Sequence, residues 1–358
     1  MNILPGVVSK TTFLTGPGVF RLILALTVVF HHTTRYVKIG DFAVYAFFIL
    51  SGYWIHKMYK EKYSLLERPF FTFIVSRWLR IYPTYLFNFL LILIIFFATN
   101  WHSLSHTTFF LNENITFWYR SFLLLTYNQL PEDLQLLRPA WSLDIELQFY
   151  IFFPVLFLIF TRIKPIVAYS IIFILSVLGN LFLSNLFKGT IGTYIPFFLV
   201  GSIVYLYDFK PSKTQVRISG ILFFGLLAIY YLHPVLRADM FTNGSMLWMG
   251  VKIFKAYNVL LAFAVIPVIA YNVKQPSSAT DRMLGNVSYD IYLFHWVIMY
   301  PYAYFFADTP LTQRLPYFAM FLVVSVVGGF ILNKYLDERI EVLRRKWIKE
   351  TKKVMVLV

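Results

Sequence analysis

Arg21 and His32 each place an ionisable side chain in an otherwise apolar segment of the sequence. Ionisable groups at membrane depth are costly and usually serve a function. Eleven positions are about three helical turns, so the two side chains share one face and lie about 16 Å apart along the axis. Histidine accepts a proton near neutral pH. A histidine at this depth is suited to accept a proton, but a histidine hydrogen-bonded between helices explains the pattern better, and spacing alone does not separate His32 from His31.

Arg77 and Arg80 form a second charged pair, directly before Ile81, Tyr82 and Pro83. A spacing of three residues puts both guanidinium groups on one face of a helix. The planar fork of arginine matches phosphate oxygens, which a lysine ammonium does not. The pair therefore indicates a phosphorylated ligand, with snorkelling toward lipid phosphates as the alternative interpretation.

Acidic residues open a later apolar run, in the stretch from Trp141 through Ser142, Asp144 and Glu146. Acids are favoured in the first turn of a helix, so capping is an adequate explanation for Asp144. Glu146 lies deeper in the run, and a role in a polar site is weighed more heavily there.

Two further stretches carry weaker signals. His295 falls in the middle of the apolar run that follows Ser288, where a helix-to-helix hydrogen bond is as good an explanation as a site. Ser51 and Gly52 end the stretch that begins at Phe47, and small residues permit close helix packing in lipid.

The elements that carry these residues are expected to be transmembrane helices. The chain of 358 residues is 59% hydrophobic and only 14% charged, whereas soluble domains carry about 25% charged residues. Spans need about 20 mostly apolar residues. The sequence predicts an all-α polytopic bundle of about ten spans, at residues 19–37, 41–56, 71–98, 141–161, 165–183, 192–207, 217–232, 252–273, 286–305 and 315–334.

Loop charge predicts how this single domain is oriented. With the N-terminus inside, lysine and arginine gather on the inner side, so the positive-inside rule favours N-in and C-in. The net charge of +15 is then topogenic and no nucleic-acid partner is expected. Residues 335–358 are expected to be a basic cytoplasmic tail, and residues 118–127, inside the polar interval 99–140, a re-entrant or interfacial helix. The chain has no cysteine, which excludes disulfides and thiolate metal sites.

Taken together, these segments resemble the acyltransferase-3 family of membrane acyltransferases, whose members O-acylate bacterial surface polysaccharides such as lipopolysaccharide O-antigen. The resemblance rests on Arg21 followed by ten residues and His32, on FFILSG at 47–52, on RWLR before IYP at 77–83, on WSL with Glu146, and on SYDIYLFHW at 288–296. The family pattern selects His32 over His31. It departs at Tyr45, where many relatives have an acid, and Asp41 is out of register, so no role is carried over to that position.

The resemblance implies a reaction in the bacterial inner membrane, with acetyl-CoA as donor and no metal. Arg21, Arg77 and Arg80 would hold the donor phosphates. His32 would be the general base on a sugar hydroxyl, or carry the acyl group briefly, with Glu146 orienting His32 or contacting the sugar. The acceptor would be a lipid-linked or lipopolysaccharide glycan on the outer side. The remaining candidates are, as substrate-binding residues, Trp141, Ser142 and Asp144 and, as further site residues, Ser51, Tyr82 and His295.

Two other classes of membrane protein compete with this interpretation. A transporter or flippase for a lipid-linked glycan would also have many spans and buried charge, but it predicts related halves with paired broken helices, which the sequence does not display. A structural or assembly protein gives no reason for Arg77 and Arg80 to share a face. Membrane lipids are expected partners under every interpretation, and the sequence leaves the oligomeric state open.

Overall fold

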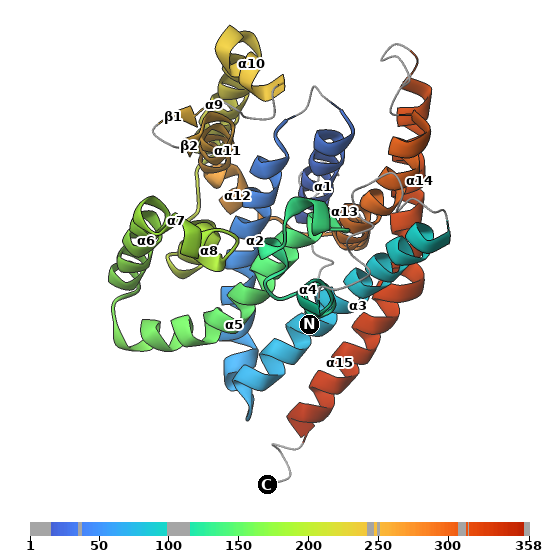
Figure 1. Cartoon of the computed structure of the whole chain (residues 1–358). Helices are drawn as coiled ribbons and strands as arrows, with labels where there is room; N and C mark the ends of the chain where they lie inside the picture. The colour runs from blue at the N-terminus through green and yellow to red at the C-terminus, as the bar shows by residue number, and fades with distance from the viewer. Residues whose placement is uncertain are drawn as a thin grey trace, which may run out of the picture.

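The computed structural model describes residues 16–34, 38–98, 115–241, 247–248, 251–306, 313 and 315–353. These residues are almost entirely helical, as the sequence predicts (Figure 1). The exception is a pair of two-residue antiparallel strands, β1 (Leu247–Trp248) and β2 (Val251–Lys252). The helices are α1 (Pro17–Thr33), α2 (Gly40–Glu61), α3 (Pro69–Ala98), α4 (Ile115–Leu123), α5 (Trp141–Arg162), α6 (Pro165–Phe182), α7 (Ser184–Phe187), α8 (Ile191–Leu206), α9 (Lys213–Leu232), α10 (Pro234–Phe241), α11 (Ile253–Ala264), α12 (Ile266–Asn272), α13 (Ala279–Phe306), α14 (Leu315–Leu332) and α15 (Glu338–Lys353).

Each of the ten predicted spans coincides largely with one helix or, for 252–273, with the broken pair α11 and α12; residues 35–37 of the first span lie outside the described residues. By length and apolar composition, five helical segments among the described residues could cross a membrane, or six if that pair, bent by 44°, is one span. The helices α1 and α8 have 17 and 16 residues, roughly 24–26 Å, which is short of a hydrocarbon core of about 30 Å. The number of spans and the N-in, C-in orientation therefore stay predictions.

Glycines set the distance between the central helices. A Cβ atom on Gly52 of α2 would lie 2.0 Å from the Phe198 carbonyl oxygen of α8, and one on Gly201 would lie 1.8 Å from the Ile49 oxygen. Neither contact is sterically allowed, so only glycine lets α2 and α8 approach this closely. This confirms the close packing predicted at Gly52 and brings the neighbouring Ser51 into the interior.

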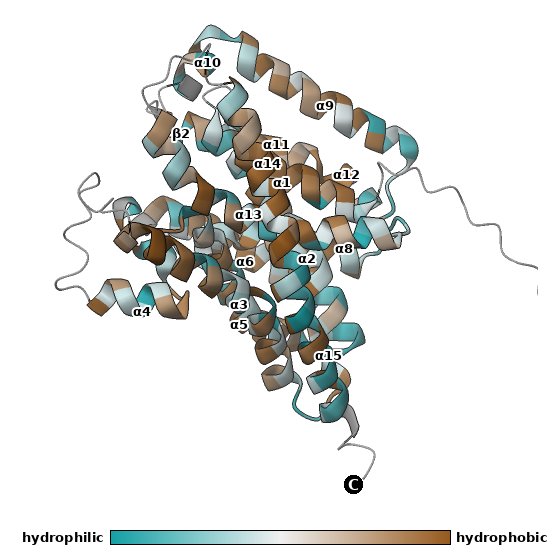
Figure 2. Cartoon of the chain, turned by 90° about the vertical axis from the view of Figure 1, so that its right-hand side faces the viewer, coloured by the Kyte–Doolittle hydropathy of each residue, from teal (hydrophilic) through white to brown (hydrophobic). Residues whose placement is uncertain are grey.

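The outer helices contrast with this interior. Figure 2 shows α9 lying along the outside of the bundle, and the most apolar stretch of α9 is only 11% buried, against 50% for the span that contains α5. The exposed side chains of α9 include Ile221 and Phe224. Such a surface is suited to lipid and leaves the polar residues of the sequence to the central helices.

The segment predicted as a basic tail is helical from Glu338 to Lys353. It continues α14 through a π-helical segment, Asn333–Asp337, and packs against α3. The many lysines and arginines of this segment suggest a solvated tail in the sequence. In the structure, one face of the helix packs against α3. The placement of this helix on the cytoplasmic side stays a prediction.

The polar interval 99–140 is described only from residue 115. There the predicted helix exists as α4, but it ends at Leu123 and is followed by Leu124 and Thr126 with positive φ angles of 53° and 60°. These left-handed residues turn the chain sharply, so the segment 124–140 forms a compact loop over the start of α5.

Candidate active site

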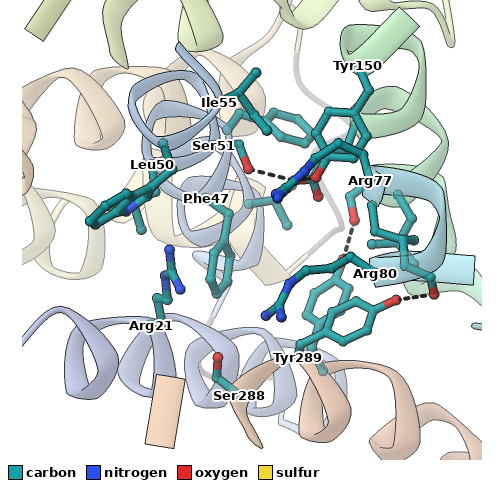
Figure 3. A pocket seen from close by; sticks show the side chains of 18 of the residues that line it. Arg21, Phe47, Leu50, Ser51, Ile55, Arg77, Arg80, Tyr150, Ser288 and Tyr289 are labelled. Atoms are coloured by element: carbon teal, nitrogen blue, oxygen red, sulfur yellow. Dashed lines mark hydrogen bonds between the residues drawn. The ribbon is translucent and has the colours of Figure 1, made fainter. Parts of the chain in front are cut away.

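Five central helices enclose a cavity of about 160 Å³. Its polar lining comes from α1, α2, α3, α5 and α13, and Figure 3 shows the guanidinium groups of Arg21, Arg77 and Arg80 around it. The other polar lining side chains are Ser51, Ser142, Glu146, Tyr150, Ser288, Tyr289 and Tyr292. Six of the sequence-predicted site residues therefore meet in one place, although they come from four helices.

The three arginines are poorly supplied with hydrogen-bond acceptors. Arg77 is 6% exposed; among the described residues its Nε has no partner, and its Nη2 reaches only the Tyr63 hydroxyl at 3.5 Å and the Met58 sulfur at 3.6 Å. Within the described ranges, Arg21 and Arg80 donate no hydrogen bond, and Arg80 has one ion pair, at 3.9 Å from Glu341. Buried donors without acceptors are unfavourable, so the cavity has the chemistry to accept an anionic ligand.

Glu146 is the carboxylate of this cavity. Its Oε1 accepts hydrogen bonds from the Ser51 hydroxyl at 2.7 Å and from the Tyr150 hydroxyl at 2.5 Å. The structure thus gives Glu146 partners in the arginine cavity, and it records no contact with His32. Tyr150 is not among the residues predicted from the sequence, although a spacing of four residues from Glu146 places both on one helix face.

His32 belongs to a second group of residues, near the other end of α1. Its ring stacks on His295 with centroids 5.7 Å apart and meets the edge of Trp296 at 4.9 Å. The neighbouring His31 is engaged elsewhere, because its Nδ1 accepts the backbone N–H of Gly40 at the start of α2. In the part of the chain that the structure describes, the ring nitrogens of His32 have no hydrogen-bond partner. The two adjacent histidines thus differ in their hydrogen bonding, and the choice of His32 as the base stays a prediction.

Tyr292 of α13 connects the two groups. It lines the arginine cavity, its hydroxyl contacts Ser142 Oγ at 2.7 Å and donates to the Pro139 carbonyl at 2.9 Å, and its ring centroid is 6.3 Å from that of His295. His295 is fully buried, and its Nε2 has no hydrogen-bond partner among the residues that the structure describes. Tyr292 lies three residues before His295, so the shared helix face was readable from the sequence, but the partner helix was not.

Besides His32 and His295, three predicted residues lie outside the cavity lining. Asp144 is fully buried, and its carboxylate accepts the backbone N–H groups of Thr126 and Asn128 at 2.9 and 2.8 Å. Through these contacts Asp144 holds the loop 124–130 in place. This structural role is closer to the capping alternative than to substrate binding. Tyr82 donates to the Phe122 carbonyl at 2.7 Å, and Trp141 packs on Phe48.

Tyr63 lies beside the cavity, in a short 3₁₀ turn after α2, and receives the guanidinium of Arg77. Burial by itself raises the pKa of the Tyr63 phenol, but the positive charge of Arg77 and the hydrogen bonds with Ser76 and Arg77 outweigh it. The pKa of Tyr63 is therefore lowered from its ordinary value. Among the described residues, no cluster of histidine and carboxylate side chains is arranged to hold a metal ion.

Comparison with known proteins gives the chain a family context. A family model described as an acyltransferase domain matches residues 15–334. The O-acetyltransferase OatA of Staphylococcus aureus strain COL is 23% identical over 313 residues, which cover 76% of this chain and 48% of that protein. A second protein of the same strain, provisionally named an O-acetyltransferase, is 23% identical over 360 residues, covering 91% and 56%. The chain thus spans about half the length of the curated relatives it matches. No solved structure gives a significant match.

Proposed function

The chain belongs to the acyltransferase-3 family of membrane O-acyltransferases, and from that premise we propose that it moves an acetyl or other short acyl group from acyl-CoA to a hydroxyl of a surface glycan. Its apolar helices make it a multi-pass membrane protein. The proposal includes the bacterial inner membrane as its location, with N-in and C-in orientation and a glycan such as lipopolysaccharide O-antigen as acceptor.

One observation carries the choice of donor. Three arginines from two helices line a single cavity, and in the described part of the chain their donors are mostly unsatisfied. A guanidinium fork matches phosphate oxygens in two parallel hydrogen bonds. The CoA part of the donor supplies phosphate groups, so Arg21, Arg77 and Arg80 would bind and orient it.

The reach of the donor fits the separation of the two groups. Arg21 and His32 lie on one continuous helix, α1, which sets them about 16 Å apart along the axis, on the same scale as an extended pantetheine arm of roughly 15–20 Å. A thioester whose phosphates are held at the arginines would therefore lie near His32.

His32 then acts as the general base of the transfer. It accepts the proton of the sugar hydroxyl while the hydroxyl oxygen attacks the thioester carbonyl, and the carbon–sulfur bond breaks to release the CoA thiolate. Tyr292 and His295, between the cavity and His32, would keep water and the acyl group apart along this path.

The experiment uses membranes that contain the full chain and a lipopolysaccharide acceptor. Wild type should transfer label from radioactive acetyl-CoA to an alkali-labile ester on the glycan, and His32→Ala at matched expression should not. If wild-type membranes consume no acetyl-CoA above vector-only membranes, the proposed donor is wrong. If they acetylate some other glycan but not lipopolysaccharide, the acceptor is wrong and the reaction stands.

A further inference from the structure

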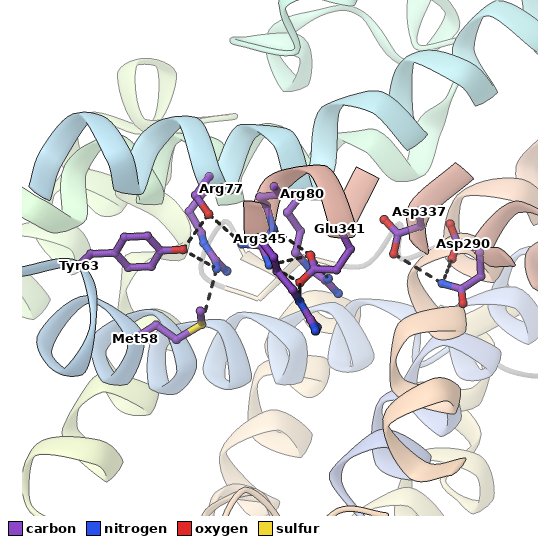
Figure 4. A network of polar contacts seen from close by, with 11 residues as sticks. Met58, Tyr63, Arg77, Arg80, Asp290, Asp337, Glu341 and Arg345 are labelled. Carbon is purple, nitrogen blue, oxygen red and sulfur yellow. Dashed lines mark hydrogen bonds and ion pairs between the residues drawn. The ribbon is translucent and has the colours of Figure 1, made fainter. Parts of the chain in front are cut away.

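The C-terminal helix α15 lies beyond the residues matched by the family model, which ends at 334. It nevertheless packs on α3 directly behind the two arginines that α3 contributes to the cavity (Figure 4). The π-helical segment before it is tied to α13, because Asn333 donates to the Asp290 carboxylate at 2.8 Å. The position of α15 is thus fixed by its packing on α3 and by the hydrogen bond between the preceding segment and α13.

Arg344 connects α15 to Arg77. The Arg344 side chain is buried, 6% exposed, and its Nη1 donates to Ser76 Oγ at 2.8 Å. Ser76 Oγ shares a hydrogen bond of 2.7 Å with the Tyr63 hydroxyl, which in turn accepts from Arg77 Nη2 at 3.5 Å. A chain of three hydrogen bonds therefore runs from α15 to a cavity arginine.

Glu341 connects α15 to Arg80. Its two carboxylate oxygens accept from Arg344 at 2.8 and 2.7 Å, which holds the carboxylate rigidly on the helix. Its Oε2 lies 3.9 Å from Arg80 Nη1, in the ion pair already noted for Arg80. At that distance the attraction orients Arg80 without occupying its hydrogen-bond donors, which stay available to a ligand.

We propose that α15 is a positioning element for the donor site, in which Arg344 sets the orientation of Arg77 and Glu341 that of Arg80. This inference rests on the proposed function, because it assumes that the two arginines bind donor phosphates. A free arginine side chain has many rotamers, and ordering them on binding weakens affinity. With α15 in place the two guanidinium groups are already held, so the donor binds without that loss.

The inference predicts a change in donor binding rather than in chemistry. Without the contacts of α15, Arg77 and Arg80 keep their charge but not their orientation, so the KM for acetyl-CoA should rise about tenfold while kcat changes little. Such a change corresponds to about 1.4 kcal/mol of donor binding. The rise in KM should be absent for a donor analogue that lacks the phosphate groups bound by the arginines.

The test compares Arg344→Ala with Arg339→Ala in the full chain. Arg339 is an exposed arginine on the same helix, so both variants lose one positive charge. The KM for acetyl-CoA and the binding of desulfo-CoA, which cannot react, are measured on purified protein in nanodiscs. Arg344→Ala should weaken both about tenfold and Arg339→Ala should leave them unchanged. Arg344→Lys, which can still donate to Ser76, should recover part of the loss.

Ser76→Ala guards against a folding artefact in Arg344→Ala, because it breaks the same chain of hydrogen bonds with a much smaller change. Ser76→Ala should raise the KM for acetyl-CoA severalfold, while its size-exclusion profile, which reports on folding, stays the same as that of wild type. If wild type transfers acetyl groups but Arg344→Ala and Ser76→Ala match Arg339→Ala, the role of α15 is wrong and the proposed function stands. If wild type neither binds desulfo-CoA nor consumes acetyl-CoA, both fall together.

Discussion

The arginine cavity and the histidine group lie at opposite ends of α1 and differ in how their polar groups are satisfied. The cavity holds three cations with few acceptors and one carboxylate, Glu146, whose Oε1 accepts from two hydroxyls. The histidine group is neutral in composition, aromatic and closely stacked around His32. The first arrangement suits binding of a charged ligand and the second suits transfer of a proton. Mutations at the two ends should therefore change different kinetic constants.

The largest effect should follow from His32→Gln. A glutamine keeps a polar side chain but cannot accept a proton at neutral pH, so kcat should fall about 10²–10⁴-fold, the usual contribution of a positioned base. His31→Gln is the matched control, because its amide oxygen can still accept the Gly40 N–H. Acetyl ester formation at saturating acetyl-CoA is the measurement. Equal loss in both variants would show that the two histidines serve one structural role.

The next effect belongs to the other end of α1. Arg77→Lys and Arg80→Lys keep the charge but lose the fork, and a hydrogen bond to a charged group contributes about 1.5–3 kcal/mol. The KM for acetyl-CoA should therefore rise by about tenfold or more with kcat nearly constant. Arg162→Lys, at the exposed end of α5, provides the control. A fall in kcat at unchanged KM would contradict the division between the two ends.

Glu146→Gln decides which region Glu146 serves. A glutamine oxygen can still accept from Ser51 and Tyr150, but the negative charge beside the arginines is lost. If Glu146 is the counter-charge of the cavity, the KM for acetyl-CoA falls severalfold and thermal stability decreases. We expect this result from its contacts. A fall in kcat with unchanged KM would instead support the role beside His32 predicted from the sequence.

The smallest effect is expected for Ser142→Ala, at the boundary between the two regions. Tyr292 loses one hydrogen bond but keeps its bond to Pro139, so stability should drop by about 1 kcal/mol and activity by less than about threefold. Tyr292→Phe removes both bonds and should cost more in each measurement. Thermal unfolding in detergent together with the acetylation rate tests the ranking, and a larger loss for Ser142→Ala would reverse it.

The sequence predicted the helices and much of the cavity because both depend on spacing along a single segment. Arg77 and Arg80 are three residues apart, and Ser51 follows an apolar run, so their faces could be derived. Contacts between distant segments could not. Asp144 looks like a site acid until the loop at Thr126 and Asn128 is folded over it. Glu341 and Arg344 look like an ordinary surface pair of a basic helix, because nothing in their spacing reveals Ser76 on α3.

One uninterrupted helix, α1, carries residues of both ends of the site and therefore fixes the distance between them. Arg21 and His32 are separated by backbone hydrogen bonds of α1 alone, so movements of the surrounding helices leave their spacing unchanged. Inserting or deleting a single residue between them would shift His32 by about 1.5 Å and turn it by about 100° around the axis. Under the proposed function, we therefore expect the chain to select acyl thioesters by the length of the arm between phosphate and acyl group, and to be inactive with thioesters too short to reach from Arg21 to His32.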